Sequence, residues 1–151
     1  MRINKQTTKE LDILYQALAL DPNNSFLMIK IGRCYRELNM VDKACEFYHK
    51  AININPNEGC AYANLAIAYL ITNRPNEALP YFQKALQLLP PYSPDYPGLL
   101  ANYGNCLGRL GYKQDAERLF LQAERAGYDT NLLNNHRNQV GIKPKKRGLF
   151  F

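Results

Sequence analysis

Two consecutive stretches of the chain share one pattern at a spacing of 34 residues: SFLMIKIGRCYRELNMVDKACEFYHKAININPNE at 25–58 and GCAYANLAIAYLITNRPNEALPYFQKALQLLPPY at 59–92. Eight positions agree in size and character. They are Met28, Ile31, Gly32, Tyr35, Ala44, Tyr48, Ala51 and Pro56 in the first stretch, and Tyr62, Leu65, Ala66, Tyr69, Ala78, Phe82, Ala85 and Pro90 in the second. Repetition at a fixed period of this size is typical of proteins built from stacked structural repeats.

The matched residues predict a pair of helices in each stretch. In the first half, large residues at i and i+3, a small residue at i+4 and an aromatic at i+7 share one helical face. The small residues let the partner helix approach closely, and Pro56 and Pro90 end the second helix because proline cannot continue it. A third copy follows four residues late, with Leu100, Tyr103, Gly104, Leu107, Ala116, Phe120 and Ala123.

This pattern resembles the tetratricopeptide repeat family. The resemblance implies an all-α fold, a right-handed helix-pair solenoid of about three repeats with a concave groove. We expect a repeat domain over 1–140, followed by a basic and apolar tail over 141–151. Within the domain we place a partial repeat at 7–24, repeats at 25–58, 59–92 and 97–130, and a capping helix at 131–140.

The two ends of the repeat array carry further expectations. Thr7 and Glu10 form a capping-box pattern, which predicts a helix start just before Leu11. The first helix of this partial repeat is missing, so Leu11, Leu14 and Leu18 are left open to a second copy of the chain, as a homodimer, or to a partner helix. At the other end we expect Thr130 to cap the last helix. Gly108 lies inside a helix without a repeat role, and it indicates either a close approach by a ligand or partner, or a weak helix.

The charges, cysteines and histidines of the chain limit the classes of protein to which it can belong. Residues 1–129 carry 14 basic and 13 acidic side chains, a net +1, whereas 130–151 carry five basic and no acidic side chains, so the charge belongs to the tail. The four cysteines lack zinc spacing, which favours a reducing, cytoplasmic setting. We interpret His49 and His136 as surface residues. No catalytic arrangement emerges, so we expect neither an enzyme nor a cofactor or metal site.

The resemblance places the first helix of each repeat along the concave groove. The predicted peptide-binding residues there are Lys30, Arg33, Asn64, Ile67, Asn102, Asn105 and Arg109. Asparagine can hold an extended peptide by its backbone amides, and the basic residues can hold acidic groups. Ile29 and Ile71 join Ile67 in an expected apolar floor. The alternative is that these polar residues only solvate the concave surface.

The tail combines basic and apolar residues: Lys143, Lys145, Lys146, Arg147, Phe150 and Phe151. It suits an anionic membrane surface, nucleic-acid phosphates or a partner's groove, and the simpler interpretation is a solubilising tail. The leading functional hypothesis is therefore an adaptor or scaffold that binds another protein through a peptide segment, perhaps acidic, in the groove. The alternatives are a small chaperone-like carrier of secreted or assembly subunits, and tail-mediated binding to a membrane or nucleic acid.

Overall fold

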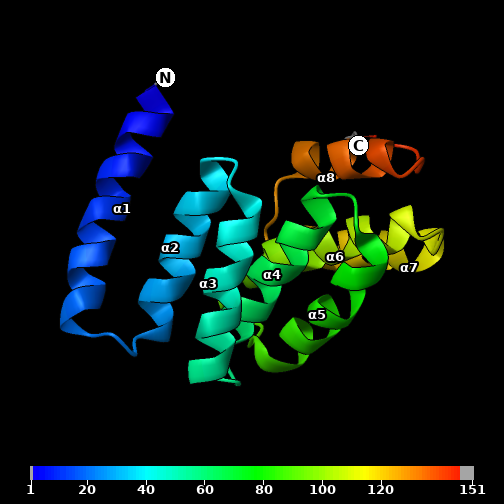
Figure 1. The fold of residues 1–151 in the computed structure, drawn as a ribbon. Coiled ribbons are helices and arrows are strands. Elements are labelled where there is room, and N and C mark those ends of the chain that lie inside the picture. Colours follow the sequence, from blue (N-terminus) through cyan, green and yellow to red (C-terminus); the bar gives the residue numbers. More distant parts are fainter. Residues whose placement is uncertain (1, 147–151) are drawn as a thin grey trace. The chain divides into compact units, whose positions relative to one another are not determined.

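The computed structural model describes residues 2–146, and this part of the chain contains helices and no strand (Figure 1). The helices are α1 (Arg2–Leu20), α2 (Ser25–Glu37), α3 (Val41–Ile54), α4 (Gly59–Ile71), α5 (Pro75–Leu88), α6 (Tyr96–Arg109), α7 (Lys113–Arg125) and α8 (Thr130–Gln139). They form two compact units that divide after Leu89, the first with α1–α5 and the second with α6–α8.

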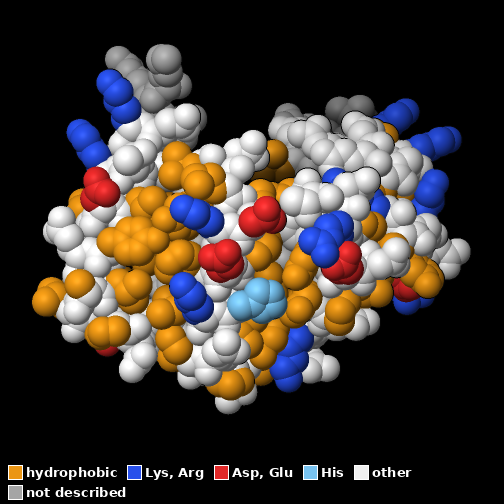
Figure 2. Space-filling model, in the orientation of Figure 1, with side chains coloured by type: hydrophobic (Ala, Val, Ile, Leu, Met, Phe, Trp, Pro, Cys, Tyr) orange, Lys and Arg blue, Asp and Glu red, His pale blue; other side chains and the backbone are white. Residues whose placement is uncertain are grey.

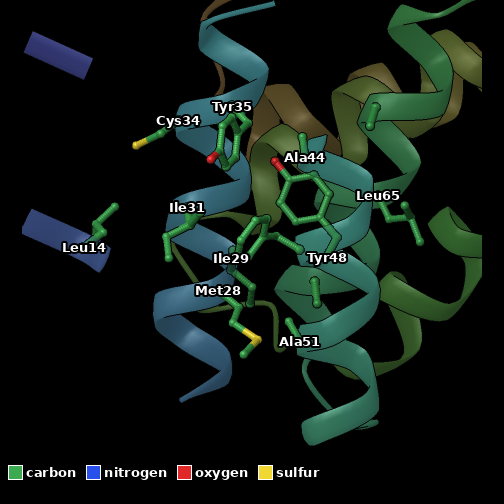
Figure 3. Packing of buried hydrophobic residues seen from close by; sticks show 13 residues of the cluster. Leu14, Met28, Ile29, Ile31, Cys34, Tyr35, Ala44, Tyr48, Ala51 and Leu65 are labelled. Carbon is green, nitrogen blue, oxygen red and sulfur yellow. The ribbon is translucent and has the colours of Figure 1, made fainter. Parts of the chain in front are cut away.

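In the first unit each helix packs on the next in chain order, and α2 also contacts α4. Small residues at the repeat positions make these contacts close: Ala44, Ala51, Ala78 and Ala85 are fully buried. A Cβ built on Gly32 would lie 2.5 Å from Cε1 of Tyr48, so a larger residue would push the two helices apart. Figure 3 shows the Tyr48 ring on α3 with Ala44 and Ala51 on the same helix and the apolar residues of α2 beside it. The predicted helix pairs are thus confirmed.

Every helix pair turns through a residue with positive φ. Asn39 (φ 60°) and Asn73 (φ 59°) follow α2 and α4, and Gly111 (φ 93°) follows α6. In each turn the next N–H closes back on the first helix, as in the bond from Met40 N to the Tyr35 carbonyl at 2.8 Å. Asparagine and glycine tolerate this left-handed conformation better than other residues, which explains their place here.

Helix α1 begins at Arg2, so the predicted start at the Thr7–Glu10 capping box is wrong. Thr7 lies inside the helix, and its hydroxyl donates to Oε2 of Glu37 on α2 at 3.1 Å. Leu14 is 7% exposed and packs in the core of the first unit, with Leu11 and Leu18 partly buried beside it. This part of α1 therefore packs against α2, and the exposed large hydrophobic side chains of α1 are Ile13, Tyr15 and Leu20.

In the second unit α6 and α7 pair in the same way, and α8 packs on both of them. A Cβ on Gly104 would lie 2.7 Å from Cε1 of Phe120, which repeats the close approach at Gly32. Helix α8 is capped by Asp129, whose carboxylate accepts from Leu132 N at 3.0 Å, rather than by Thr130 as expected. A Cβ on Gly108 would lie 2.6 Å from Cβ of Val140, so this glycine makes room for the end of α8.

Candidate functional site

The polar centre of the first unit lies between α2 and α4. Nε of Arg33 and Nη1 of Arg36 both donate to Oδ1 of Asn64, each at 3.3 Å. Nδ2 of Asn64 donates to the Cys60 carbonyl at 2.7 Å, one turn earlier on its own helix. The amide orientation is thus set by α4, and Oδ1 faces the two guanidinium groups. We call Arg33, Arg36 and Asn64 the arginine–asparagine cluster.

Asn64 is 5% exposed, so it is a buried acceptor for arginine rather than an open grip for peptide amides. Arg33 is exposed and Arg36 half-buried. Two positively charged donors therefore share one neutral oxygen, whereas a carboxylate can bind a guanidinium group through two parallel hydrogen bonds. Arg36 was absent from the predicted set. Its position three residues after Arg33, on the same helical face, was the signal in the sequence.

The other predicted residues of this unit differ in exposure. Lys30 is half-buried, with Nζ 5.0 Å from the ring centroid of Phe26, which is itself 60% exposed. Ile67 is half-buried and Ile71 is exposed. Ile29 is 4% exposed and belongs to the core, so its predicted place in an apolar floor is wrong.

In the second unit Asn102 repeats the conformation of Asn64. Its Nδ2 donates to the Gly98 carbonyl at 2.9 Å, again one turn earlier on the same helix. Oδ1 of Asn102 accepts no hydrogen bond from the residues that the structure describes, and the side chain is half-exposed. Peptide binding through this oxygen stays a prediction.

Asn105 lies beneath α8 and is 1% exposed, so its side chain does not face an open groove. Its Nδ2 bonds Nδ1 of His136 at 2.9 Å and Oε1 of Gln139 at 2.7 Å. The sequence does not show this cover, because α8 lies about thirty residues further along the chain. The amide holds the last helix on α6.

His136 is half-buried, and its prediction as a surface residue is wrong. The ring stacks on Phe120 with centroids 6.0 Å apart. Burial lowers the pKa of His136, and the positive charge of Arg109 lowers it further. Arg109 is exposed in the last turn of α6 and contributes positive charge to this surface. His49 is exposed, as expected.

The described part of the tail is tied to the second unit. The side-chain amide of Asn134 accepts from Lys145 N at 3.0 Å and donates to the Lys145 carbonyl at 3.2 Å. Nζ of Lys145 pairs with Glu124 at 2.8 Å. Lys143 and Lys146 are exposed. Arg147, Phe150 and Phe151 lie outside the described residues.

The architecture of both units is that of an all-helical repeat protein, in which helix hairpins bury small residues against aromatic ones. Residues 24–90 match the family model described as tetratricopeptide repeat. Residues 24–90 therefore belong to the tetratricopeptide repeat family, whose repeats generally serve as protein–protein interaction modules. No match was found among curated proteins.

In the described part of the chain, no helix is long and apolar enough to span a membrane. Among residues 2–146, no group of three or more His, Cys, Asp or Glu side chains is placed to hold a metal ion.

Proposed function

We propose that this protein is an adaptor that binds an extended, acidic segment of another protein, with a carboxylate of that segment held by the arginine–asparagine cluster. The observation that supports this is the convergence of Arg33 and Arg36 on Oδ1 of Asn64. An incoming carboxylate offers up to four lone-pair positions, and it can accept from both guanidinium groups while Asn64 stays in place.

The second unit has candidate binding groups of its own. Asn102 offers a free oxygen to a backbone N–H, and Arg109 adds positive charge on the same helix. Lys30 and Ile67 give the first unit a further basic group and an apolar contact. Within the first unit alone, the combination of basic and apolar side chains suits an extended acidic peptide.

The test places the photo-crosslinking residue p-benzoylphenylalanine at Lys30 on α2, and at Asn53 on α3 as a control, in cells that make the protein. We expect specific crosslinked partners from position 30 and not from position 53. The pair of substitutions Arg33→Gln and Arg36→Gln should abolish these crosslinks. Arg118→Gln, in an exposed ion pair on α7, should leave them unchanged.

Circular dichroism of each variant distinguishes loss of binding from loss of fold. Equal crosslinking from positions 30 and 53, or crosslinks that survive in the folded double variant, would refute the arginine–asparagine cluster as the binding site. Partners that are secreted or assembly subunits would assign the protein to the chaperone-like class of adaptors.

A further inference from the structure

The first unit contains an aromatic arrangement that the binding surface above does not use. In the repeat at 25–58, Tyr35 on α2 stacks on Phe47 on α3, with ring centroids 5.6 Å apart and planes at 26°. Tyr15 on the preceding helix meets the Phe47 ring edge-on at 6.1 Å and 77°. Three helices thus contribute one ring each to a compact cluster.

The same arrangement recurs 34 residues later. Tyr69 on α4 stacks on Tyr81 on α5 at 5.5 Å and 16°. His49 on α3 meets the Tyr81 ring edge-on at 6.4 Å and 75°. The geometry of the two clusters is nearly identical, because each ring occupies the same position in the repeat.

Side chains of the protein itself cover the first cluster and satisfy its hydroxyl groups. The hydroxyls of Tyr15 and Tyr35 are hydrogen-bonded at 2.7 Å. Nζ of Lys50 lies 4.6 Å from the centroid of Phe47, and Nζ of Lys43 lies 5.3 Å from that of Tyr35. Figure 2 shows hydrophobic side chains gathered over α1 and α2, with separate charged groups among the apolar side chains of this face.

The second cluster borders an open depression of about 520 Å³ between α4 and α5. This volume lies within the range of side-chain and small-ligand sites, roughly 300–1,000 Å³. We call the depression the tyrosine pocket; it is lined by Tyr62, Tyr69, Glu77, Pro80, Tyr81 and Lys84. Its walls are mainly apolar, since three tyrosine rings and a proline ring form them.

Three polar groups of the pocket have no hydrogen-bond partner in residues 2–146. The hydroxyls of Tyr69 and Tyr81 and Nζ of Lys84 make no hydrogen bond with any residue that the structure describes. Burial raises the pKa of Tyr69, so its hydroxyl stays protonated and able to donate at neutral pH. Both carboxylate oxygens of Glu77 already accept hydrogen bonds from Arg74. The pocket therefore offers positive charge and donors above an aromatic wall.

The comparison between the repeats shows what the open cluster lacks. Lys84 occupies the repeat position of Lys50, which lies over the Phe47 ring. His49 occupies the position of Tyr15, but it makes no hydrogen bond to the hydroxyl of Tyr69 among the described residues. A ligand that brings a hydrogen-bonding group to the hydroxyl of Tyr69 supplies the bond that Tyr15 makes to Tyr35 in the first repeat.

The geometry points to a second docking site in the tyrosine pocket, for an aromatic side chain followed by a carboxylate in an extended segment of a partner protein. The ring packs against the stacked pair of Tyr69 and Tyr81. The carboxylate accepts from Lys84 and from the tyrosine hydroxyls. One carboxylate matches the single unpaired charge of Lys84, whereas a phosphate would carry more negative charge beside Glu77.

The probe is the amidated peptide Gly-Pro-Phe-Asp-Pro-Gly with 4-fluorophenylalanine as its aromatic residue, titrated with the full chain and followed by fluorine NMR. A matched peptide carries Asn in place of Asp. We expect saturable binding of the acidic peptide, weakened about tenfold by Lys84→Gln, as for loss of one charged hydrogen bond. Lys50→Gln is the control at the equivalent repeat position and should leave the affinity unchanged.

Three further arms make the result decisive. Tyr81→Phe copies the residue of the first repeat, keeps the ring stack and should also weaken binding. Arg33→Gln leaves the pocket intact, so loss of binding in this variant alone would place the probe on the arginine–asparagine cluster and overturn the proposal. Equal affinity of the acidic and Asn peptides, equal losses in Lys50→Gln and Lys84→Gln, no saturation, or tighter binding of adenosine monophosphate than of the peptide would also overturn it.

Discussion

Removing the carboxylate of Glu117 is expected to destabilise the second unit more than removing the guanidinium of Arg137 that it binds. Arg137 is fully buried, and its Nε and Nη2 donate to Glu117 at 2.9 and 3.0 Å. Nη1 donates to Asn134 at 3.1 Å, and the guanidinium lies 5.7 Å from the Phe120 centroid. The Glu117 side chain, in contrast, is 34% exposed.

The loss of unfolding free energy in each variant depends on whether the charge that remains can reach water. Glu117→Leu leaves a buried guanidinium with one neutral acceptor, and loss of one partner of a buried pair costs about 3–5 kcal/mol. Arg137→Met leaves a carboxylate that water can reach, so the cost is about 1–2 kcal/mol, that of lost hydrogen bonds. The double variant should regain most of the loss of Glu117→Leu, since no buried charge remains.

The assay is hydrogen exchange with mass spectrometry, which reports the opening free energy of α7 and α8 separately from the first unit. Urea unfolding followed by circular dichroism gives a second measure. If Arg137→Met costs as much as Glu117→Leu, or if the double variant is worse than either single one, burial of the guanidinium is not what makes this pair sensitive.

Three other outcomes follow from the structure. Gly108→Ala should loosen α8 and speed its hydrogen exchange, because a methyl group has no room beside Val140. Gly98→Ala, in contrast, should be neutral or add up to about 1 kcal/mol of helix stability. Equal effects of the two substitutions in unfolding experiments would count against this packing argument. Burial lowers the pKa of His136 in the folded state below about 6.5, its usual value. The neutral imidazole therefore contributes its full stability above that pH, and this contribution is lost as the pH falls through the folded pKa. The free energy of unfolding should drop less steeply in acid for His136→Gln than for the wild type, and parallel pH curves would contradict the argument. Burial raises the pKa of Cys34 and Cys106 to about 11, so both thiols should resist alkylation at neutral pH until the chain unfolds, and rapid labelling of either in the folded protein, detected by mass spectrometry, would disprove it.

The helix pairs were predictable because their signal is local. Gly32 and Tyr48 stand 16 residues apart in one repeat, and the same pairing recurs at Gly104 and Phe120. A period that repeats small and bulky positions leaves few alternatives for packing. Asn39 and Asn73 in the turns also occupy equivalent positions of their repeats, although their left-handed conformation was not inferred from the sequence.

The ends of the chain were less predictable because their structure depends on distant partners. Thr7 has the sequence of a helix cap, but its hydroxyl bonds Glu37, and the helix continues to Arg2. Arg137 and His136 lie in a polar segment that indicates a solvated face. Arg137 is buried and His136 is half-buried because α7 and α6 provide Glu117 and Asn105 at the required places.

For the candidate binding residues too, the local sequence determines one part of their structure and distant partners determine the rest. Periodicity placed Arg33, Asn64 and Asn102 on the first helices of their repeats, because helical spacing decides which residues share a face. It could not show that Asn64 is bound by two arginines while Asn102 keeps an oxygen free, since that depends on the side chains of the neighbouring helix.

From the residues alone one can derive an all-helical chain of repeats, the positions of its small and large core residues, and the helices that carry the polar candidates. These properties follow from the periodicity of the helix and from side-chain volume. The cover of Asn105 by α8, the buried charge of Arg137 and the open tyrosine pocket beside a closed copy of the same aromatic cluster arise only in three dimensions. Each depends on contacts between segments 12 to 34 residues apart, which no local pattern records.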